Sequence, residues 1–569
     1  MTQPPGQQPP QEGFGAPYEP QPGQYGQPPQ PYGQPPQQYG PPPQPYGPPP
    51  QQYGPPPQPH GRQMPGVYGY PQPQPQPQPQ PPGGTGRGGR SRRRPAVVVA
   101  AGLAVCLIVG GGVWFATSGG DGEKKPVAQH STAGPPSPPP PTGDGKGKAA
   151  VDHDTAEKLN AGRKSGEAKV LWIQKNGVDL PRNGADAYGP WIVGDTVVKA
   201  MYRTVSGYSV KDGAQKWSLR LPSDVCAAPT RSTADGKIVI GIESSAASDA
   251  PCESLQMIDL TTGKAGWRKS YERPGAWDGL SDVAMAINGD VLTVGRTSRT
   301  DAFRVRDGKA LWGKLPGNCQ PFGFVSGPVP IAAASCQTEA DDHADQQVQR
   351  IDPATGKVGW TYKVKKGWQV DQFYSVSPLV VSLRKNGEEG WVIVVLNADG
   401  TYRSQLIGGT DDYAAQCGGD VLTRGKNVDN CLGVAADANT FYLATKPKYV
   451  GSDMTNAVVA FDLDTGRSKW KVPAPAGQTL MPMRVEGGRA LIYMDATKGK
   501  GGGIMSLAPT GGTLRPVLRH PASAAEVERG FSLPRVVYAN GRSLLMHGFV
   551  SGVNDEEEIA MRTMISFGG

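Results

Sequence analysis

The sequence is poor in the residues from which most metal and nucleophile sites are built. Its 569 residues include only six His and seven Cys. It has no C-x-x-C or C-x-x-C-H motif and no adjacent pair of cysteines, so neither the closely spaced ligands of a structural zinc site nor that type of covalent haem is indicated. It also has no G-x-S-x-G motif, which excludes that nucleophile elbow. We therefore expect no catalytic, cofactor-binding or metal-binding residue, and no cofactor.

The net charge of the chain is also small for its length. The chain carries 58 Lys and Arg against 50 Asp and Glu, a formal net charge of +8. So small a surplus does not provide the basic surface that nucleic-acid binding requires, and we expect no nucleic-acid partner. The densest basic run, RGGRSRRR at Arg87 to Arg94, directly precedes a long apolar run. Anionic lipid headgroups are therefore its expected partner.

That apolar run, AVVVAAGLAVCLIVGGGVWFA, occupies residues 96–116 and contains no charge. A helix rising about 1.5 Å per residue would match the roughly 30 Å core of a bilayer. The preceding arginines predict a single-pass plasma-membrane protein with a cytoplasmic N-terminus. Two alternatives are a cleaved signal peptide, with a weak cleavage site at Ala116 to Ser118, and lipidation at Cys106 within the lipobox-like LAVC.

The segments on either side of this run are polar and rich in Pro. Residues 1–86 are mostly Pro, Gln, Gly and Tyr, which predicts a disordered cytoplasmic tail. Its tyrosines recur every seven residues from Tyr18 to Tyr53, so it is either an inert spacer or a docking tail for a cytoplasmic partner. Residues 87–95 form a basic juxtamembrane segment, and residues 117–166 form an extracytoplasmic stalk. The charged stretch from Asp152 to Ala168 suits a short helix before the first strand. The Gly, Pro, Ala and Arg bias suggests a high-GC bacterium of the actinobacterial kind.

A short phrase recurs along the second half of the chain. Its clear copies are YSVKDGAQKW, MIDLTTGKAGW, FRVRDGKALW, RIDPATGKVGW and AFDLDTGRSKW. Each is an alternating strand, a Gly turn, and a Trp four residues after the Gly. The turn glycines Gly213, Gly263, Gly308 and Gly356 are 50, 45 and 48 residues apart, a period typical of stacked supersecondary units. One unit cannot bury its own apolar face, so the units must pack on one another.

Two degenerate copies extend the series: VLNADGTYRS has Ser404 at the Trp position, and SLAPTGGTLR has Arg515 there. The last strands, in RVVYANGRSLLMHGFV and EEIAMRTMISF, lack the turn and the Trp, but AKVLWIQK near the start resembles a copy around Trp172. Pairing this first strand with the last unit would close a ring and remove its exposed edges. We predict an all-β propeller of eight four-stranded blades over residues 167–568, with seven blades as the alternative.

The pattern D-x-x-T-G-x-x-x-W resembles the tryptophan-docking repeat of the pyrroloquinoline-quinone-like (PQQ-like) β-propellers. That family includes quinoprotein dehydrogenases, an outer-membrane assembly lipoprotein and external domains of bacterial receptor kinases. Its dehydrogenases hold a quinone and a calcium ion in the central funnel, with an acidic residue as base and, in several, a disulfide between adjacent cysteines. The absent Cys-Cys pair therefore disfavours an enzyme. We interpret the repeat tryptophans as structural residues that dock each blade onto its neighbour, namely Trp217, Trp267, Trp312, Trp360 and Trp470.

Six cysteines lie in the predicted external domain, an even number that suits disulfides in an oxidising compartment. Fifteen pairings are possible. Proximity in sequence favours Cys226 with Cys252, Cys319 with Cys336, and Cys417 with Cys431. The third pair would close a loop inside the unusually long gap between two of the turn glycines.

The remaining polar groups point to no chemistry. We expect the acidic clusters at Asp341 to Asp345 and at Asp555 to Glu558 to be solvated loops. We expect His153, His343, His520 and His547 to fill surface or turn positions.

These features predict a non-catalytic, single-pass membrane protein whose external propeller binds an envelope protein, peptide or polymer. Two alternatives remain open. One is a PQQ-dependent dehydrogenase, and the other is an external sensor that signals by clustering its cytoplasmic tails.

Overall fold

The computed structural model describes residues 151–569 except for 182–183, 248–249, 274–282, 337–343, 387–389 and 418–426. The predicted tail (1–86), basic segment (87–95), membrane helix (96–116) and first part of the stalk lie outside these residues. Among the residues that are described, no helix is both long enough and apolar enough to cross a bilayer.

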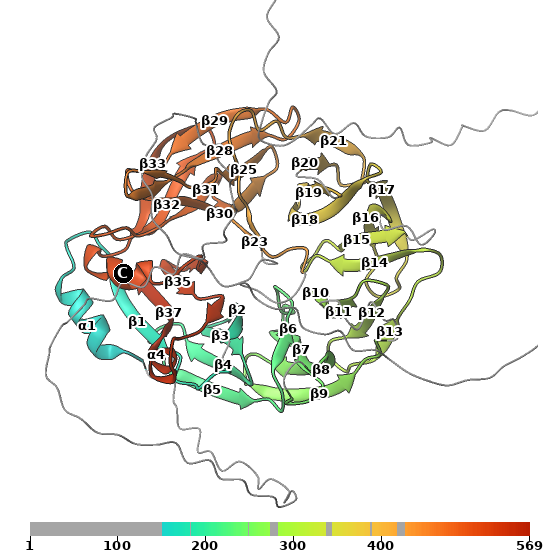
Figure 1. Ribbon diagram of the computed structural model, residues 1–569, viewed down its shortest axis with the longest axis horizontal. Helices are drawn as coiled ribbons and strands as arrows, with labels where there is room; N and C mark the ends of the chain where they lie inside the picture. Colours follow the sequence, from blue (N-terminus) through green and yellow to red (C-terminus); the bar gives the residue numbers. More distant parts are fainter. Residues whose placement is uncertain are drawn as a thin grey trace, which may run out of the picture. The chain divides into compact units, whose positions relative to one another are not determined.

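The described residues form an eight-bladed propeller, which confirms the prediction of eight blades over seven (Figure 1). In seven blades the strands follow one another outward from the axis in chain order, each antiparallel to the next. The first four blades are β2 (Ala185–Val193), β3 (Thr196–Met201), β4 (Thr204–Ser209) and β5 (Gln215–Arg220); β6 (Val225–Ala227), β7 (Lys237–Glu243), β8 (Cys252–Asp259) and β9 (Lys264–Ser270); β10 (Ala284–Asn288), β11 (Val291–Gly295), β12 (Thr300–Arg304) and β13 (Ala310–Trp312); and β14 (Cys319–Phe324), β15 (Ile331–Cys336), β16 (Asp345–Ile351) and β17 (Val358–Lys363). The next three are β18 (Trp368–Val376), β19 (Leu379–Lys385), β20 (Trp391–Leu396) and β21 (Tyr402–Gln405); β24 (Val434–Asp437), β25 (Thr440–Ala444), β28 (Ala457–Asp462) and β29 (Ser468–Pro473); and β30 (Leu480–Glu486), β31 (Arg489–Met494), β32 (Gly503–Ala508) and β33 (Gly511–Arg519).

The eighth blade joins the two ends of the described chain, as predicted. Its strands, from the axis outward, are β34 (Arg535–Ala539), β35 (Arg542–Met546), β37 (Arg562–Gly568) and β1 (Lys169–Lys175). The antiparallel register of β1 and β37 runs from Lys169 opposite Gly568 to Lys175 opposite Arg562. A short strand, β36 (Phe549–Val550), also adds to the edge of β2 in the first blade. The ring is therefore closed by two separate strand pairings.

The middle strands of each blade are apolar because neighbouring blades cover both of their faces. In β7, which reads KIVIGIE, the side chains of Ile238, Val239, Ile240 and Ile242 are fully buried. The outer strands are covered on one side only. In β9, for example, every residue except Trp267 is exposed. This contrast explains why the inner strands read as continuous Val and Ile runs and the outer strands as polar segments with one aromatic.

The antiparallel order gives the ring two unlike faces. On one side, which we call the turn face, tight turns make most of the connections from the first strand of a blade to the second and from the third to the fourth. The connection from β6 to β7, residues 228–236, is a longer exception. The opposite side, which we call the loop face, carries the longer connections within and between blades. Its connections contain the small elements β22 (Gln416–Cys417), β23 (Cys431–Leu432), β26 (Lys448–Val450), β27 (Asp453–Thr455), η1 (Ala522–Ala524), α3 (Ala525–Arg529) and α4 (Asp555–Ala560).

Helix α1 (His153–Ala161) lies in the range predicted as stalk, but it packs against the ring. The Asn160 side chain accepts from the Val170 N–H and donates to the Val170 carbonyl, both at 2.9 Å. At the other end, Asp152 forms an ion pair with Lys175 (3.3 Å). The folded domain therefore includes residues from 151 onward.

Adjacent blades are joined by the repeat tryptophans. Each indole lies over the turn glycine of the next blade, where an added Cβ would come within 2.4 to 3.3 Å of the ring. At Gly263, for example, a Cβ would lie 2.4 Å from Trp217, and its φ of 72° also favours glycine. Five indole N–H groups donate to a backbone carbonyl just before that glycine; the donors and acceptors are Trp172 to Val210, Trp267 to Val305, Trp312 to Pro353, Trp360 to Ala398 and Trp470 to Pro509.

Three joints depart from this pattern, and one of them is at the seventh repeat, where Arg515 replaces the indole. The indole N–H of Trp217 is buried without a hydrogen-bond partner among the described residues. At the degenerate fifth repeat, Ser404 replaces the indole, and its hydroxyl donates to the Leu463 carbonyl at 2.6 Å. Serine thus keeps the hydrogen bond of the joint while giving up its apolar contact.

Trp172 is 1% exposed and holds the closing blade onto the first. We expect Trp172→Ala to destabilise the protein by about 3–5 kcal/mol, because it removes a buried aromatic from the closure. Trp172→Phe should cost less, since it keeps most of the apolar contact. Guanidinium unfolding of the full chain measures both, with the half-buried Trp360→Ala as the comparison. A loss below about 1 kcal/mol in Trp172→Ala would contradict the role of this indole in closure.

Candidate functional site

The centre of the ring is crossed by residues 427–432, which we call the plug (Figure 1). The plug lies in the connection between β21 and β24, and its strand β23 pairs with β22. The Asn427 side chain donates to the Ala228 carbonyl (2.8 Å) and accepts from the Met285 N–H (2.8 Å). The Val428 carbonyl accepts from the Phe373 N–H at 2.7 Å. These partners belong to the second, third and fifth blades, so the plug is fixed across the axis.

Asp429 is the acidic residue of the plug. Its Oδ2 accepts from the Thr230 hydroxyl (2.7 Å) and from the Ser326 N–H (2.8 Å). Its Oδ1 is buried and has no hydrogen-bond partner among the described residues. Burial raises the pKa of Asp429, and the two hydrogen bonds only partly oppose that shift.

A cavity of about 210 Å³ lies between the plug and the innermost strands. Asp429 and Cys431 line it from the plug, Trp191 from β2, and Arg535 from β34. The Arg535 guanidinium donates through Nη1 to the Gly189 carbonyl (2.7 Å), and burial lowers its pKa. The cavity lining thus contains one carboxylate and one guanidinium among apolar and neutral polar side chains, such as Trp191 and Asn430.

The residues at the axis do not fit the quinone and calcium ion that the resemblance implies. The plug occupies the middle of the ring, and Asp429 already accepts two hydrogen bonds that hold it there. Across the described ranges, no group of three or more His, Cys, Asp or Glu side chains is placed to hold a metal ion. We derive no chemistry through such a group.

Ser543, His520 and Glu528 lie in the order of a catalytic triad. The Ser543 hydroxyl lies 2.7 Å from His520 Nε2, and His520 Nδ1 lies 2.7 Å from Glu528 Oε1. All three residues are at most 2% exposed, and the His520 ring stacks on Phe567. A substrate cannot reach this serine, so the network holds the seventh and eighth blades together. The prediction that His520 fills a surface or turn position was wrong.

His547 was also predicted at the surface, but it is buried beside Lys199. The Lys199 ammonium donates to the Thr563 hydroxyl at 3.0 Å, across the joint between the first and eighth blades. Burial lowers the pKa of Lys199 to about 8. Burial, with the Lys199 charge as a second cause, lowers the pKa of His547 to about 4. His153 is exposed on α1, and His343 lies outside the described residues.

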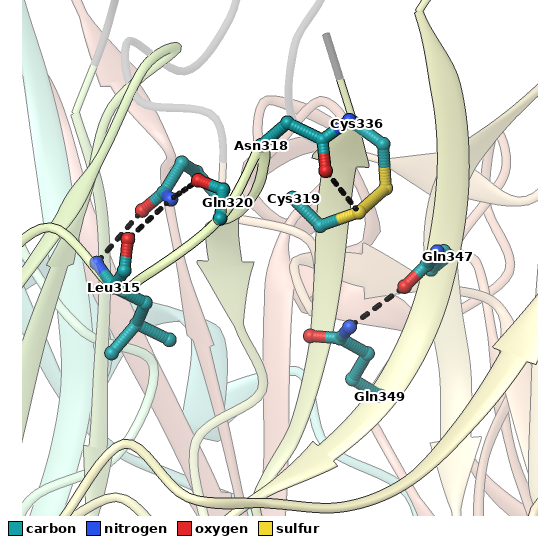
Figure 2. The surroundings of a disulfide bond; sticks show 8 residues. Leu315, Asn318, Cys319, Gln320, Cys336, Gln347 and Gln349 are labelled. Carbon is teal, nitrogen blue, oxygen red and sulfur yellow. Dashed lines mark hydrogen bonds between the residues drawn. A yellow bond between two sulfur atoms is a disulfide. The ribbon is translucent and has the colours of Figure 1, made fainter. Parts of the chain in front are cut away.

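The six cysteines form three disulfides: Cys226–Cys252, Cys319–Cys336 and Cys417–Cys431. These are the pairs favoured by proximity in sequence. All three lie toward the loop face. Figure 2 shows the second disulfide, in which Cys319 of β14 and Cys336 of β15 are directly opposite in the strand register. Nearby, the Gln320 side chain accepts a hydrogen bond from the Leu315 N–H at 2.9 Å. Cys431 alone among the predicted site residues lines the cavity.

The acidic cluster of α4 differs from the expectation of a solvated loop. Glu558 is buried, and its Oε2 accepts from the Leu180 N–H at 2.8 Å. Asp345 is exposed, as expected, and 341–343 lie outside the described residues. Asp429 and Arg535 were not predicted. The long gap that contains Cys417 and Cys431 was the available signal for the plug, whereas no pattern in the sequence distinguishes Arg535.

Comparison with known proteins gives one family match. The model of the family described as outer membrane protein assembly factor BamB matches residues 161–316. The chain is similar to the structure of BamB from Moraxella catarrhalis, with 14% identity over 68% of this chain and 97% of that chain and a TM-score of 0.38. It is also similar to the quinohemoprotein alcohol dehydrogenase from Comamonas testosteroni, with 13% identity over 72% and 77% of the two chains and a TM-score of 0.42. No curated protein matches the chain in sequence.

The lowered pKa of Lys199 makes stability depend on pH. Below about pH 8 the folded protein must bury a charged ammonium, whereas between about 8 and 10.5 it has released a proton that the unfolded chain still binds. Stability should therefore rise with pH in that range. We expect Lys199→Met to stabilise the protein by about 3 kcal/mol at neutral pH, with an advantage that shrinks above pH 8.

Denaturant unfolding of both proteins between about pH 7 and 9.5 checks this expectation, in a range where the buried tyrosines, whose pKa values lie higher, stay neutral. Lys216→Met is the matched control, because that lysine is partly exposed and paired with Asp195. A constant difference between wild type and Lys199→Met across the range would contradict the assignment.

Proposed function

We propose, from the premise that this chain is a PQQ-like β-propeller repeat protein, that it is a non-catalytic binding platform of the cell envelope. In this proposal residues 96–116 anchor the chain in the membrane and the ring lies outside. The loop face binds an envelope protein, peptide or polymer.

The difference between the two faces carries the proposal. On the turn face, the glycines of the turns between the third and fourth strands lie under indoles at six joints, so this part of its geometry is committed to joining blades. The loop face bears the longer connections and all three disulfides. Variable connections on a rigid scaffold are where binding residues concentrate in other proteins. The loop face is therefore the better surface for a partner.

The disulfides support a location outside the cytoplasm. Cytosolic thiols are kept reduced, and structural disulfides are typical of secreted and extracytoplasmic domains. Each bond here closes a connection of 14 to 26 residues, which stabilises a loop by about 3 kcal/mol in the chain-entropy account. The charge order around residues 96–116 supports the same side of the membrane.

The blocked axis supports binding over catalysis. In a quinoprotein the funnel is the place of the chemistry, and here the plug fills it with hydrogen bonds to several blades. The one triad-like group is enclosed between two blades. A surface that binds a partner needs neither an open funnel nor an accessible catalytic group.

Photo-crosslinking in intact cells tests which face binds. Tyr449 in the β26–β27 hairpin of the loop face is 70% exposed and suits a crosslinking amino acid. Lys211, in an exposed turn of the turn face, is the matched control position. We expect a reproducible envelope partner crosslinked at Tyr449 and none at Lys211. Crosslinks from Lys211 alone would contradict the proposal.

The extracytoplasmic location makes a second prediction about thiols. Of the seven cysteines, only Cys106 lies outside the three disulfides. Alkylation of the denatured, unreduced full chain, followed by mass spectrometry, should therefore modify Cys106 and no other cysteine. Alkylation of two or more cysteines without a reductant would contradict an oxidising location.

A further inference from the structure

The cavity beside the plug has features that the binding of a partner at the loop face does not explain. Its volume of about 210 Å³ is far larger than the roughly 10–15 Å³ that one water needs. It is smaller than the roughly 300–1,000 Å³ of pockets that hold drug-sized ligands. The volume therefore suits a molecule of a few heavy atoms.

Asp429 supplies one polar end. Its Oδ2 is occupied by Thr230 and Ser326, whereas its Oδ1 is buried without a partner among the described residues. A buried carboxylate oxygen without a donor is costly, and a cationic donor is the group that compensates it best. The charge of Arg231 lowers the pKa of Asp429 only in part, and no ion pair of the described residues includes Asp429.

Arg535 supplies the other end. Nη1 of its guanidinium donates to the Gly189 carbonyl, and the structure shows no other hydrogen bond from this side chain to the described residues. The planar guanidinium fork suits a carboxylate. Asp429 and Arg535 line the same cavity from different elements and form no ion pair with each other.

Part of the cavity wall is apolar, and Thr230, Asn427 and Asn430 add neutral polar groups to the lining. The indole of Trp191 is 4% exposed, and its N–H already donates to the Pro229 carbonyl at 3.1 Å, so the ring offers only its apolar surface. Pro229 and Val536 complete this wall. A ligand that suits this cavity is therefore small and carries a charge complementary to Asp429 and a charge complementary to Arg535.

We propose that this cavity binds an amino-acid-sized zwitterion, with the ligand ammonium on Asp429 and the ligand carboxylate on Arg535. Free amino acids and the end residues of short peptides share this chemistry. The proposal is independent of which partner the loop face binds.

Calorimetric titration of the purified full chain tests the proposal. Glycine, alanine, valine and lysine are the zwitterions, alanylalanine represents a peptide end, and propionate and ethylamine each carry one of the two charges. We expect saturable binding of at least one zwitterion or of the dipeptide, and binding of the single-charge compounds that is weaker by about tenfold or more. Free amino acids alone would identify a metabolite site, and the dipeptide alone a peptide-end site.

Two variants locate the binding. Asp429→Asn keeps an acceptor for Ser326 and Thr230 but loses the charge, and Arg535→Lys keeps the charge but loses the fork. Both should weaken binding by about tenfold or more. Glu556→Gln, at an exposed residue of α4, is the matched control and should bind as wild type. Hydrogen exchange of residues 427–432 verifies that the plug is still in place.

The absence of saturable binding by every compound in wild type would overturn the proposal, and Asp429 would then serve only to hold the plug. Unchanged binding by Asp429→Asn with the plug intact would overturn it as well, and so would equal binding of propionate or ethylamine. None of these results affects crosslinking at Tyr449, so the failure of this proposal is distinguishable from failure of the platform.

Discussion

The pairing of β1 with β37 is the constraint on which the ring depends. Seven blades are built from consecutive strands, and only the eighth needs residues that are almost 400 positions apart in the chain. Without that pairing β37 would present a free edge, and the first and last blades would each lose a packed face. Trp172, the β36–β2 pairing and the hydrogen bond that the Leu180 N–H donates to Glu558 all reinforce this same seam. Closure also fixes the width of the central opening of the ring, in which the plug and its cavity lie.

Most of the architecture could be predicted from local spacing, because each repeat contains its own turn, strand and docking aromatic. The stray Trp172 was enough to predict closure, and the short separations of the cysteines were enough to favour their pairs. The buried polar network was not predictable. His520, Glu528 and Ser543 meet only after the seventh and eighth blades pack, and Glu558 becomes buried only because the chain near Leu180 returns to it. From residue type alone, such polar side chains are expected at the surface.

The centre of the ring was the least predictable part. The plug comes from one long connection. Apart from the local Cys417–Cys431 bond, its partners lie in the second to fifth blades, so no short sequence window contains both sides of those contacts. The long gap between repeats indicated an insertion, but it did not indicate where that insertion would go. Filling the axis in this way changes what the fold can do. The funnel that serves chemistry in the quinoprotein propellers is reduced here to a small, partly open cavity with charged groups in its lining.

The docking of α1 has a mechanical consequence. Any pull on the ring from the N-terminal side of the chain reaches the contacts of α1 before it reaches β1. The Asp152–Lys175 ion pair, the paired hydrogen bonds of Asn160 with Val170 and the bond from Ser523 to Leu159 must all shear first. The contacts of helix α1 thus protect β1, the strand that closes the ring, from a pulling force. If force is applied to the chain before α1, the β1–β37 pairing should stay intact until the contacts of α1 break.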